Sequence, residues 1–357
     1  LLVIERLKGD DIVSVVMFDH AVETIVPAAR LREQEAIAQR IRGITPGGRT
    51  AIYAGVEEGL RQVQKFQSAA YANRVILLSD GLANVGPSTA ADLADLGRRA
   101  GSLGIPVTTI GLGLDYNEDL MTRLALASDG NHAFVEKPED LNRIFRAELG
   151  DVLSTVAQEI EIEIRIKQGY RPVRILGREA KVEGDRVRLR MGQLAAAQEK
   201  YVILELEGQA ATRSGTVDVA EVVASYHDPD RKQQQKASKP VKAEVAASQA
   251  EVEASTDREV MSAVTVQIAT EESERAVLLR DKGQIEEARK VLERNAAILK
   301  KRSEELAPKG QEPKATTLGR LSDKYEKDAK RITSQDWDRT RKALRADQIK
   351  EKNQQSY

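Results

Sequence analysis

Short runs of apolar residues alternate with segments of helical period along the first 150 residues. The apolar runs predict buried strands at residues 11–18, 22–27, 74–79, 105–110 and 132–135. Apolar residues spaced three and four apart predict helices at residues 31–42, 51–66, 89–100, 115–127 and 138–149. Buried strands that alternate with helices are typical of a parallel sheet covered on both faces. The pattern therefore predicts a doubly wound α/β domain over residues 1–150.

The pattern changes near residue 155, where apolar and polar residues alternate strictly. Five such runs across residues 151–230 predict a small antiparallel β-sandwich. Residues 231–256 have little hydrophobic period, which predicts a flexible linker.

Residues 257–357 return to a helical pattern. It predicts a helical hairpin broken at Gly283, followed by one charged helix over residues 317–350 that carries Trp337. Alternating charge on that helix favours a solvated face over a helix docked on a partner.

Composition excludes several classes of protein. The 55 basic and 56 acidic residues leave a net charge of −1, which argues against nucleic-acid binding by bulk electrostatics. The chain has no cysteine, which excludes disulfides, thiolate metal sites and a cysteine nucleophile. No apolar run approaches the ~18 residues of a membrane span. The compartment stays open, and a cytoplasmic location is the default expectation.

Two polar residues stand where a parallel sheet places its functional site. Thr50 follows a Gly-Gly-Arg loop, and Asp80 follows a buried strand. The carboxyl ends of parallel strands share one edge, and a hydroxyl beside a carboxylate suits a hard cation such as Mg²⁺. The alternative is that Thr50 caps its helix and Asp80 caps a turn. The residues alone leave both interpretations open.

Other motifs are weaker. The stretch 115–119 begins like a calcium loop but lacks the central glycine and the closing glutamate, so a helix N-cap explains it better. Gly111-Leu-Gly113 lacks the third glycine of a dinucleotide-binding loop. The chain has neither a P-loop nor a G-x-S-x-G motif.

Four stretches carry a resemblance to a known family: DIVSVVMFDHAVETIVP, GGRTAIYAGVEEGL, RVILLSDGLANVGPS and VTTIGLGLDYNEDLMTRLA. In order and spacing, residues 1–150 resemble a von Willebrand factor type A (VWA) domain, most similar to the bacterial branch related to inter-alpha-trypsin inhibitor heavy chains and calcium-activated chloride channel homologues. The resemblance implies a doubly wound fold with a metal-ion-dependent adhesion site for Mg²⁺, Mn²⁺ or Ca²⁺. It places Thr50 and Asp80 among the metal ligands.

The resemblance also shows a difference. The family's first strand and its Asp-x-Ser-x-Ser loop have no counterpart here and would precede Leu1. We therefore expect that the native N-terminus is missing, that the metal site is incomplete, and that the strands at 11–18 and 74–79 lack a shared partner strand.

The function implied by the resemblance is protein binding. A cation held by Thr50 and Asp80 would bind an acidic residue of a partner, with Arg49 and Asn84 as further contacts, and no catalysis is expected. One alternative is a structural or assembly subunit with a degenerate metal site. Another is a metal-dependent hydrolase, for which only Asp19 and Asp80 offer a base.

Overall fold

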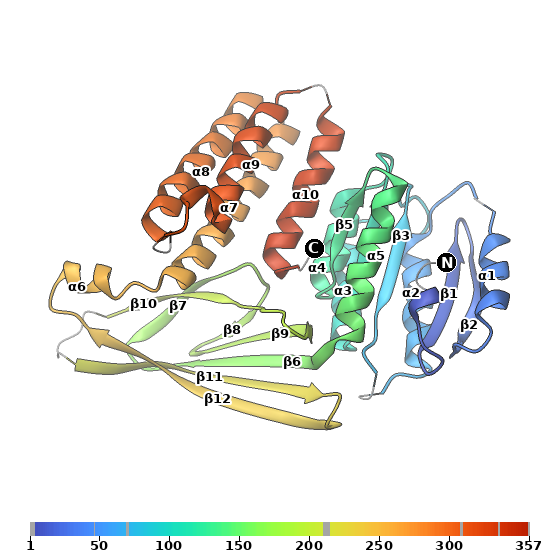
Figure 1. Ribbon diagram of the computed structural model, residues 1–357, viewed down its shortest axis with the longest axis horizontal. Helices are drawn as coiled ribbons and strands as arrows, with labels where there is room; N and C mark the ends of the chain where they lie inside the picture. The colour runs from blue at the N-terminus through green and yellow to red at the C-terminus, as the bar shows by residue number, and fades with distance from the viewer. Residues whose placement is uncertain are drawn as a thin grey trace.

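A computed structural model divides the chain into three regions. An α/β region comes first, an antiparallel β region follows, and a helical region ends the chain (Figure 1). The described residues are 4–45, 47–68, 71–209, 215–307, 310–334 and 336–355.

The α/β region alternates strands with helices after one 3₁₀ turn at Ile4–Arg6. Its elements are β1 (Ile12–Phe18), β2 (Val22–Arg30), α1 (Gln34–Arg42), α2 (Ile52–Gln64), β3 (Val75–Ser79), α3 (Ala90–Ser102), β4 (Val107–Leu112), α4 (Glu118–Ala127), β5 (His132–Val135) and α5 (Pro138–Leu153). Strands β3, β4 and β5 form a parallel sheet in that order. Leu93 and Leu124 pack with α2 on one face, and Ile144 of α5 packs on the other. The predicted doubly wound fold is confirmed.

The sheet of the α/β region is in two parts. β1 and β2 form an antiparallel hairpin, and within the described residues no ladder of hydrogen bonds joins it to β3. Helix α2 bridges the parts, because Phe18 of β1 and Leu77 of β3 lie against one hydrophobic core. The expectation that these two strands lack a shared partner strand is confirmed.

The antiparallel region consists of two sheets that face each other. Its strands are β6 (Thr155–Ile166), β7 (Tyr170–Leu176), β8 (Lys181–Glu183), β9 (Arg186–Ala195), β10 (Ile203–Gly208), β11 (Gly215–Asp228) and β12 (Gln233–Val245). Five strands pair in the order β12-β11-β6-β9-β8, and β7 pairs with β10. Ile164, Val187 and Leu204 of the two sheets share one core. The outer face carries ion pairs such as Glu163 with Arg188, which explains the strict alternation.

The flexible linker expected over residues 231–256 is wrong for most of that stretch. β12 pairs with β11 from Gln233 to Val245, and a short helix α6 follows at Gln249–Ala254. Nearly all side chains of β12 are exposed, so no apolar period marks the strand. Backbone hydrogen bonds to β11 in a long hairpin hold β12 in place, rather than burial of apolar side chains. The domain bounds proposed above, 1–150, 151–230 and 257–357, stay predictions.

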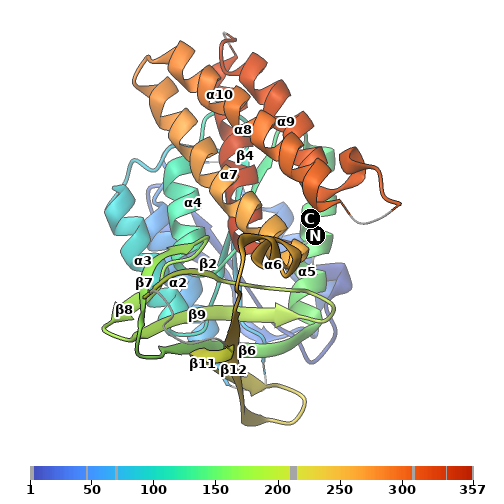
Figure 2. The same ribbon diagram turned by 90° about the vertical axis from the view of Figure 1, so that its left-hand side faces the viewer.

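The helical region lies above the antiparallel sheets (Figure 2). Its main helices are α7 (Arg258–Asp281), α8 (Ile285–Leu306), α9 (Thr317–Arg331) and α10 (Trp337–Asn353), with a 3₁₀ turn at Pro313–Ala315. The predicted hairpin of α7 and α8 is confirmed, and Gly283 supplies its turn with a φ of +79°. Among the described residues, no helix has both the length and the apolar character needed to cross a bilayer.

The single helix expected over residues 317–350 is two helices. The chain turns between α9 and α10, so that Ile332 and Trp337 both pack against the core that contains Leu292. The break lets the buried Ile332 and the partly buried Trp337 contact the same core.

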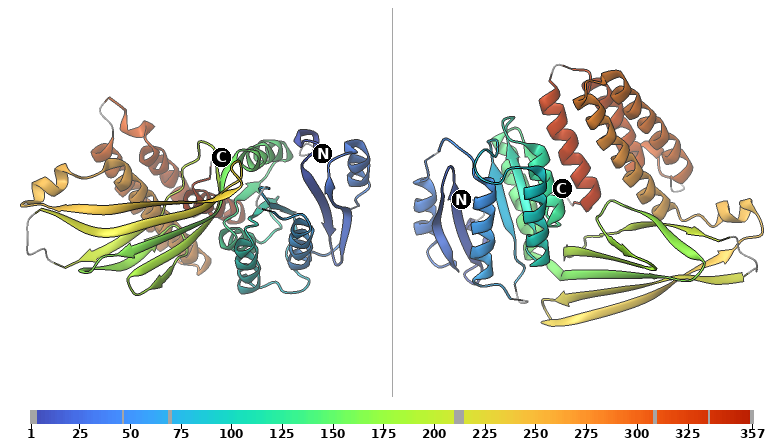
Figure 3. Two further views of the ribbon diagram at one scale, coloured as in Figure 1. Left: turned by 90° about the horizontal axis from the view of Figure 1, so that it is seen from below. Right: turned by 180° about the vertical axis from the view of Figure 1, so that it is seen from behind.

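Helix α10 is not the solvated helix that its charge pattern favoured. It lies between α7 and the α/β region (Figure 3). Leu344, Ile349 and even Lys342 are buried, the lysine with 4% of its surface exposed. Its buried face includes polar residues that have specific partners, so the apolar period is weak although the helix is docked.

Candidate functional site

Three loops meet at the carboxyl edge of the α/β region. They carry Asp19 after β1, Thr50 before α2, and Asp80 after β3, and we call these three residues the rim cluster. The amide of Ala51 donates to the carbonyl oxygen of Asp19 at 2.8 Å, and the amide of Asn84 donates to that of Thr50 at 3.2 Å. Backbone hydrogen bonds therefore join the three loops at the edge where such a sheet places its site.

The backbone of Thr50 is held by Asn84 through both its amide and its carbonyl group, and the Thr50 hydroxyl takes no part. Its amide donates to the side-chain oxygen of Asn84 at 2.9 Å. A β-carbon on Gly81 would lie 2.6 Å from the Thr50 hydroxyl oxygen, closer than real contacts allow, so the glycine keeps space open there.

The capping alternative for Thr50 is wrong. Helix α2 begins at Ile52, its N-cap is Ala51, and no side chain caps it. The Thr50 hydroxyl is therefore not used to satisfy the start of the helix.

Asp80 does not cap the turn after β3 either. The hydroxyl of Ser79 closes that turn, with Gly81 as its partner through both the amide and the carbonyl group. Asp80 is exposed, and within the described ranges its carboxylate makes no hydrogen bond or ion pair. It faces solvent as an uncompensated negative charge.

Asp19 is a third oxygen donor at this edge. Its carboxylate accepts a hydrogen bond from the amide of Ala21 at 2.8 Å and contacts His20 at 3.0 Å. The hydrogen bond from Ala21 is the main reason that the pKa of Asp19 lies below its ordinary value. A side chain on Gly47 would collide with this carboxylate.

The donor set of the rim cluster fits a hard divalent cation that keeps most of its waters. Mg²⁺ is commonly bound by one or two carboxylates and retains several water ligands. Across the described part of the chain, no three histidine, aspartate or glutamate side chains lie together as a ready-made metal site. The two carboxylates and one hydroxyl therefore supply part of a coordination sphere.

The residues expected as partner contacts lie at this edge in different roles. Arg49 is exposed on the loop that carries Thr50. Asn84 uses its side-chain oxygen and its backbone amide to hold Thr50. Asn84 is thus also a structural brace, a role that its position in a loop after a strand did not reveal.

A second charged group lies between the start of α4 and helix α10. We call it the α10 contact, and its members are Tyr116, Glu118, Asp119, Arg341, Lys342 and Arg345. The side chain of Asn117 caps α4 by accepting from the amide of Leu120, as the helix-cap interpretation of residues 115–119 predicts.

The α10 contact has no counterpart among the features predicted from the sequence. Complementary charge, acidic at residues 115–119 and basic at 339–345, is the signal that could have found it. The two segments are more than two hundred residues apart, so no local period connects them.

The acids of the α10 contact are neutralised by the chain itself. The Lys342 amine donates to Glu118 at 2.6 Å, and Arg341 pairs with both Glu118 and Asp119. Burial alone would raise the pKa of Asp119, but the hydrogen bond from Arg341 and the charge of Arg345 outweigh it and hold that pKa below its ordinary value.

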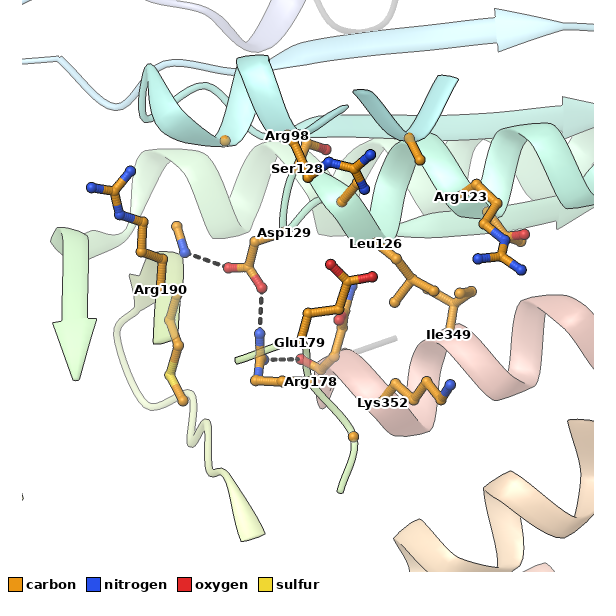
Figure 4. Close-up of a pocket in the computed structure, with 18 of the residues that line it drawn as sticks. Arg98, Arg123, Leu126, Ser128, Asp129, Arg178, Glu179, Arg190, Ile349 and Lys352 are labelled. Carbon is orange, nitrogen blue, oxygen red and sulfur yellow. Dashed lines mark hydrogen bonds and ion pairs between the residues drawn. The ribbon is translucent and has the colours of Figure 1, made fainter. Parts of the chain in front are cut away.

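A cavity of about 1410 Å³ lies where the three regions meet. In Figure 4, Asp129 and Arg178 form an ion pair at its wall, while Arg98 and Arg123 lie on the side of the α/β region. Burial opposes ionisation of Asp129, but Lys200 and Arg178 outweigh it and lower the pKa of Asp129 to about 2. These ion pairs join the α/β region to the antiparallel region, which is a structural role.

Comparisons with known proteins agree with the fold. Residues 2–147 match the family model of the von Willebrand factor type A domain. An uncharacterized protein of Synechocystis sp. is 29% identical over 143 residues, 40% of this chain and 33% of that protein. Inter-alpha-trypsin inhibitor heavy chain H3 of Bos taurus is 25% identical over 172 residues, 46% of this chain and 19% of that protein. The chain thus spans about a third of the length of the first relative and less of the second.

Solved structures extend the likeness beyond the first region. A von Willebrand factor type A protein from Catenulispora acidiphila has a TM-score of 0.71 at 14% identity and covers 85% of this chain and 74% of its own. The human COPII-coat protein Sec24c has a TM-score of 0.57 at 13% identity, over 92% of this chain and 52% of its own. At such identities the likeness shows the fold alone.

The family model, the relatives and the topology lead to the same assignment. The model covers the elements from β1 to α5, and the parallel sheet with helices on both faces is the fold that the resemblance implied. Residues 2–147 therefore match the von Willebrand factor type A domain in both sequence and fold, with the rim cluster at the carboxyl edge of this region.

Proposed function

We propose that this chain is a protein-binding module that holds a divalent cation at the rim cluster. One observation carries the proposal: the hydroxyl of Thr50 and the carboxylate of Asp80 lie at the carboxyl edge without the capping roles that would otherwise explain them. A hard cation would supply the missing positive charge.

Each residue has a stated role in this proposal. Asp80 and Thr50 bind the cation directly or through water, and Asp19 adds a second negative charge nearby. Asn84 holds Thr50 in place, and Arg49 contacts the partner. One coordination position of the cation would be left to water. An acidic residue of the partner protein would bind there through its carboxylate, so the cation would be the point of recognition.

The test is isothermal calorimetry of Mg²⁺ and Mn²⁺ on the chain and two variants. Asp80→Ala is expected to weaken binding about a hundredfold, which removes most of the heat at the same concentrations. Asp115→Ala is the matched control, because Asp115 is also exposed and lies on a neighbouring loop of the same edge. Equal titrations for all three proteins would contradict the proposal.

The second candidate is a structural or assembly subunit whose metal site has degenerated. The lack of a third acidic or histidine ligand among the described residues favours it. The two candidates differ in their response to EDTA, because partner affinity would persist in the chelator only for the metal-independent subunit.

A hydrolase is the least supported candidate. The relatives named above have no enzymatic name. Metal-dependent turnover that is lost in Asp80→Ala would revive it.

A further inference from the structure

Helix α10 reaches into the carboxyl edge through one buried lysine. The amine of Lys342 donates to the carbonyl oxygen of Tyr116 at 2.8 Å and to Glu118 at 2.6 Å. The same amine lies 4.5 Å from the centre of the Tyr116 ring, within the range of a cation–π contact. Lys342 thus holds both the backbone and the ring of Tyr116.

Tyr116 in turn lies against the strand next to the rim cluster. Its ring occupies the space beside Gly111, where any side chain would collide with it. Gly111 of β4 pairs with Ser79 of β3. Ser79 precedes Asp80 and closes the turn that presents it. Direct contacts therefore run from Lys342 through Tyr116 and Gly111 to the loop of Asp80.

The other end of this connection is the helical region. Gln348 of α10 donates to Ser273 of α7 at 2.9 Å, and Lys352 pairs with Glu274 at 2.6 Å. Arg341 also pairs with Asp281 at the end of α7. Helix α10 is therefore attached to α7 and to the edge of the α/β region at once.

We propose that Lys342 is a positioning residue for the rim cluster, and that α10 transmits the state of the helical region to the loop of Asp80. The inference rests on the proposed function, since it concerns the same cation site. The binding of a partner to the helical region would change cation affinity by shifting α10. Suppose that the docked position of α10 raises cation affinity by a given factor. By linkage, cation binding at the rim cluster then stabilises the docked position of α10 by the same factor.

The variants separate positioning from general stability. Lys342→Met keeps the length of the side chain and removes its charge and its hydrogen bonds. Arg339→Met is the matched control, because it removes an ion pair of α10 with Glu136 of the α/β region and leaves Tyr116 untouched. Tyr116→Phe removes only a buried hydroxyl that has no partner among the described residues, so it is expected to behave as the parent chain.

Two readouts are compared, Mn²⁺ affinity by calorimetry and amide hydrogen exchange. In Lys342→Met we expect Mn²⁺ affinity to fall about fivefold to tenfold, and exchange at residues 79–84 and 111–117 to quicken by a similar factor. In the parent chain, saturating Mn²⁺ is expected to slow exchange at residues 339–345. If Lys342→Met does not fold, Lys342→Gln replaces it, because the amide removes the charge beside the Tyr116 ring and can still donate a hydrogen bond.

The outcomes distinguish this proposal from the proposed function. Unchanged exchange at residues 79–84 in the Lys342 variant, or equal changes in Arg339→Met, would overturn the positioning role whatever the metal does. Absence of Mn²⁺ binding by the parent chain would overturn the proposed function. In that case, faster exchange at residues 79–84 in Lys342→Met alone still shows that Lys342 stabilises the loop of Asp80 through Tyr116 and Gly111.

Discussion

Two groups of acidic residues lie at the carboxyl edge of one α/β region and differ in where their counter-charge comes from. In the α10 contact, Glu118 and Asp119 are paired with Arg341, Lys342 and Arg345 of the same chain. In the rim cluster, Asp80 has no cation beside it in the described residues, and Asp19 has only the exposed His20.

The difference separates structural acids from candidate ligands. A buried carboxylate needs a partner, and α10 supplies one, so the charges of these acids are compensated within the fold. The exposed carboxylate of Asp80 has no such partner, and the next residue, Gly81, lies against the Thr50 hydroxyl. The rim cluster is therefore the better candidate for an external cation. The comparison makes predictions about both groups.

The largest expected effect is on folding. Glu118→Gln leaves Lys342 and Arg341 buried without their shared carboxylate, and removing one partner of a buried pair costs about 3 kcal/mol of unfolding free energy. Thermal denaturation monitored by circular dichroism measures the loss. Asp115→Asn, at an exposed position of the same edge, should leave the unfolding free energy unchanged. An equally large loss of stability in that variant would contradict the difference between buried and exposed acids.

The next effect is on metal binding. Thr50→Val and Asp80→Ala should each weaken Mn²⁺ binding, by about tenfold and about a hundredfold respectively, because they remove a hydroxyl and a charged ligand. Neither should lower the melting temperature, since neither side chain caps a helix or a turn. Calorimetry and a melting curve on the same samples check both statements. A large drop in stability would make these residues structural after all.

A smaller effect tests the space beside Thr50. Gly81→Ala places a methyl group 2.6 Å from the Thr50 hydroxyl oxygen, so the hydroxyl must rotate away and Mn²⁺ affinity should fall about threefold to tenfold. Gly48→Ala is the control, because a β-carbon there meets nothing within 4 Å. Equal affinities in the two variants would show that the orientation of Thr50 does not matter.

The smallest effect is the response of the α10 contact to acid. The pKa of Asp119 in the folded chain lies below its ordinary value, because Arg341 and Arg345 outweigh the effect of its burial. A lowered pKa contributes stability that is present above the unfolded value and is lost as pH falls through the folded one. The amide NMR signals of residues 117–120, which surround Asp119, should therefore stay constant from pH 7 to about 4 and change below. A transition above pH 5 would contradict the assignment.

The sequence predicted what depends on local period and failed where distant segments meet. The apolar runs of β1, β3 and β4 identified the α/β fold, and the alternation around Glu163 identified the antiparallel sheets. β12 was missed because its exposed side chains carry no period. The docking of α10 was missed because Lys342 is buried by virtue of its ion pairs.

The candidate site was predictable only in part. The positions of Thr50 and Asp80 follow from their places after a glycine loop and a strand, since parallel strands end at one edge. The brace formed by Asn84 and the contact of Lys342 with Tyr116 depend on loop geometry and on tertiary packing. Neither has a signal in the local sequence.

The most direct test is Mn²⁺-induced line broadening in the amide NMR spectrum of the chain, beside the Asp80→Ala variant. The account predicts broadening centred on the amides around residues 19, 50 and 80 in the parent chain, and its loss in the variant. Broadening that persists in Asp80→Ala, or that centres on Glu118 and Asp119 instead, would contradict the claim that the unpaired acids of the rim cluster form the cation site.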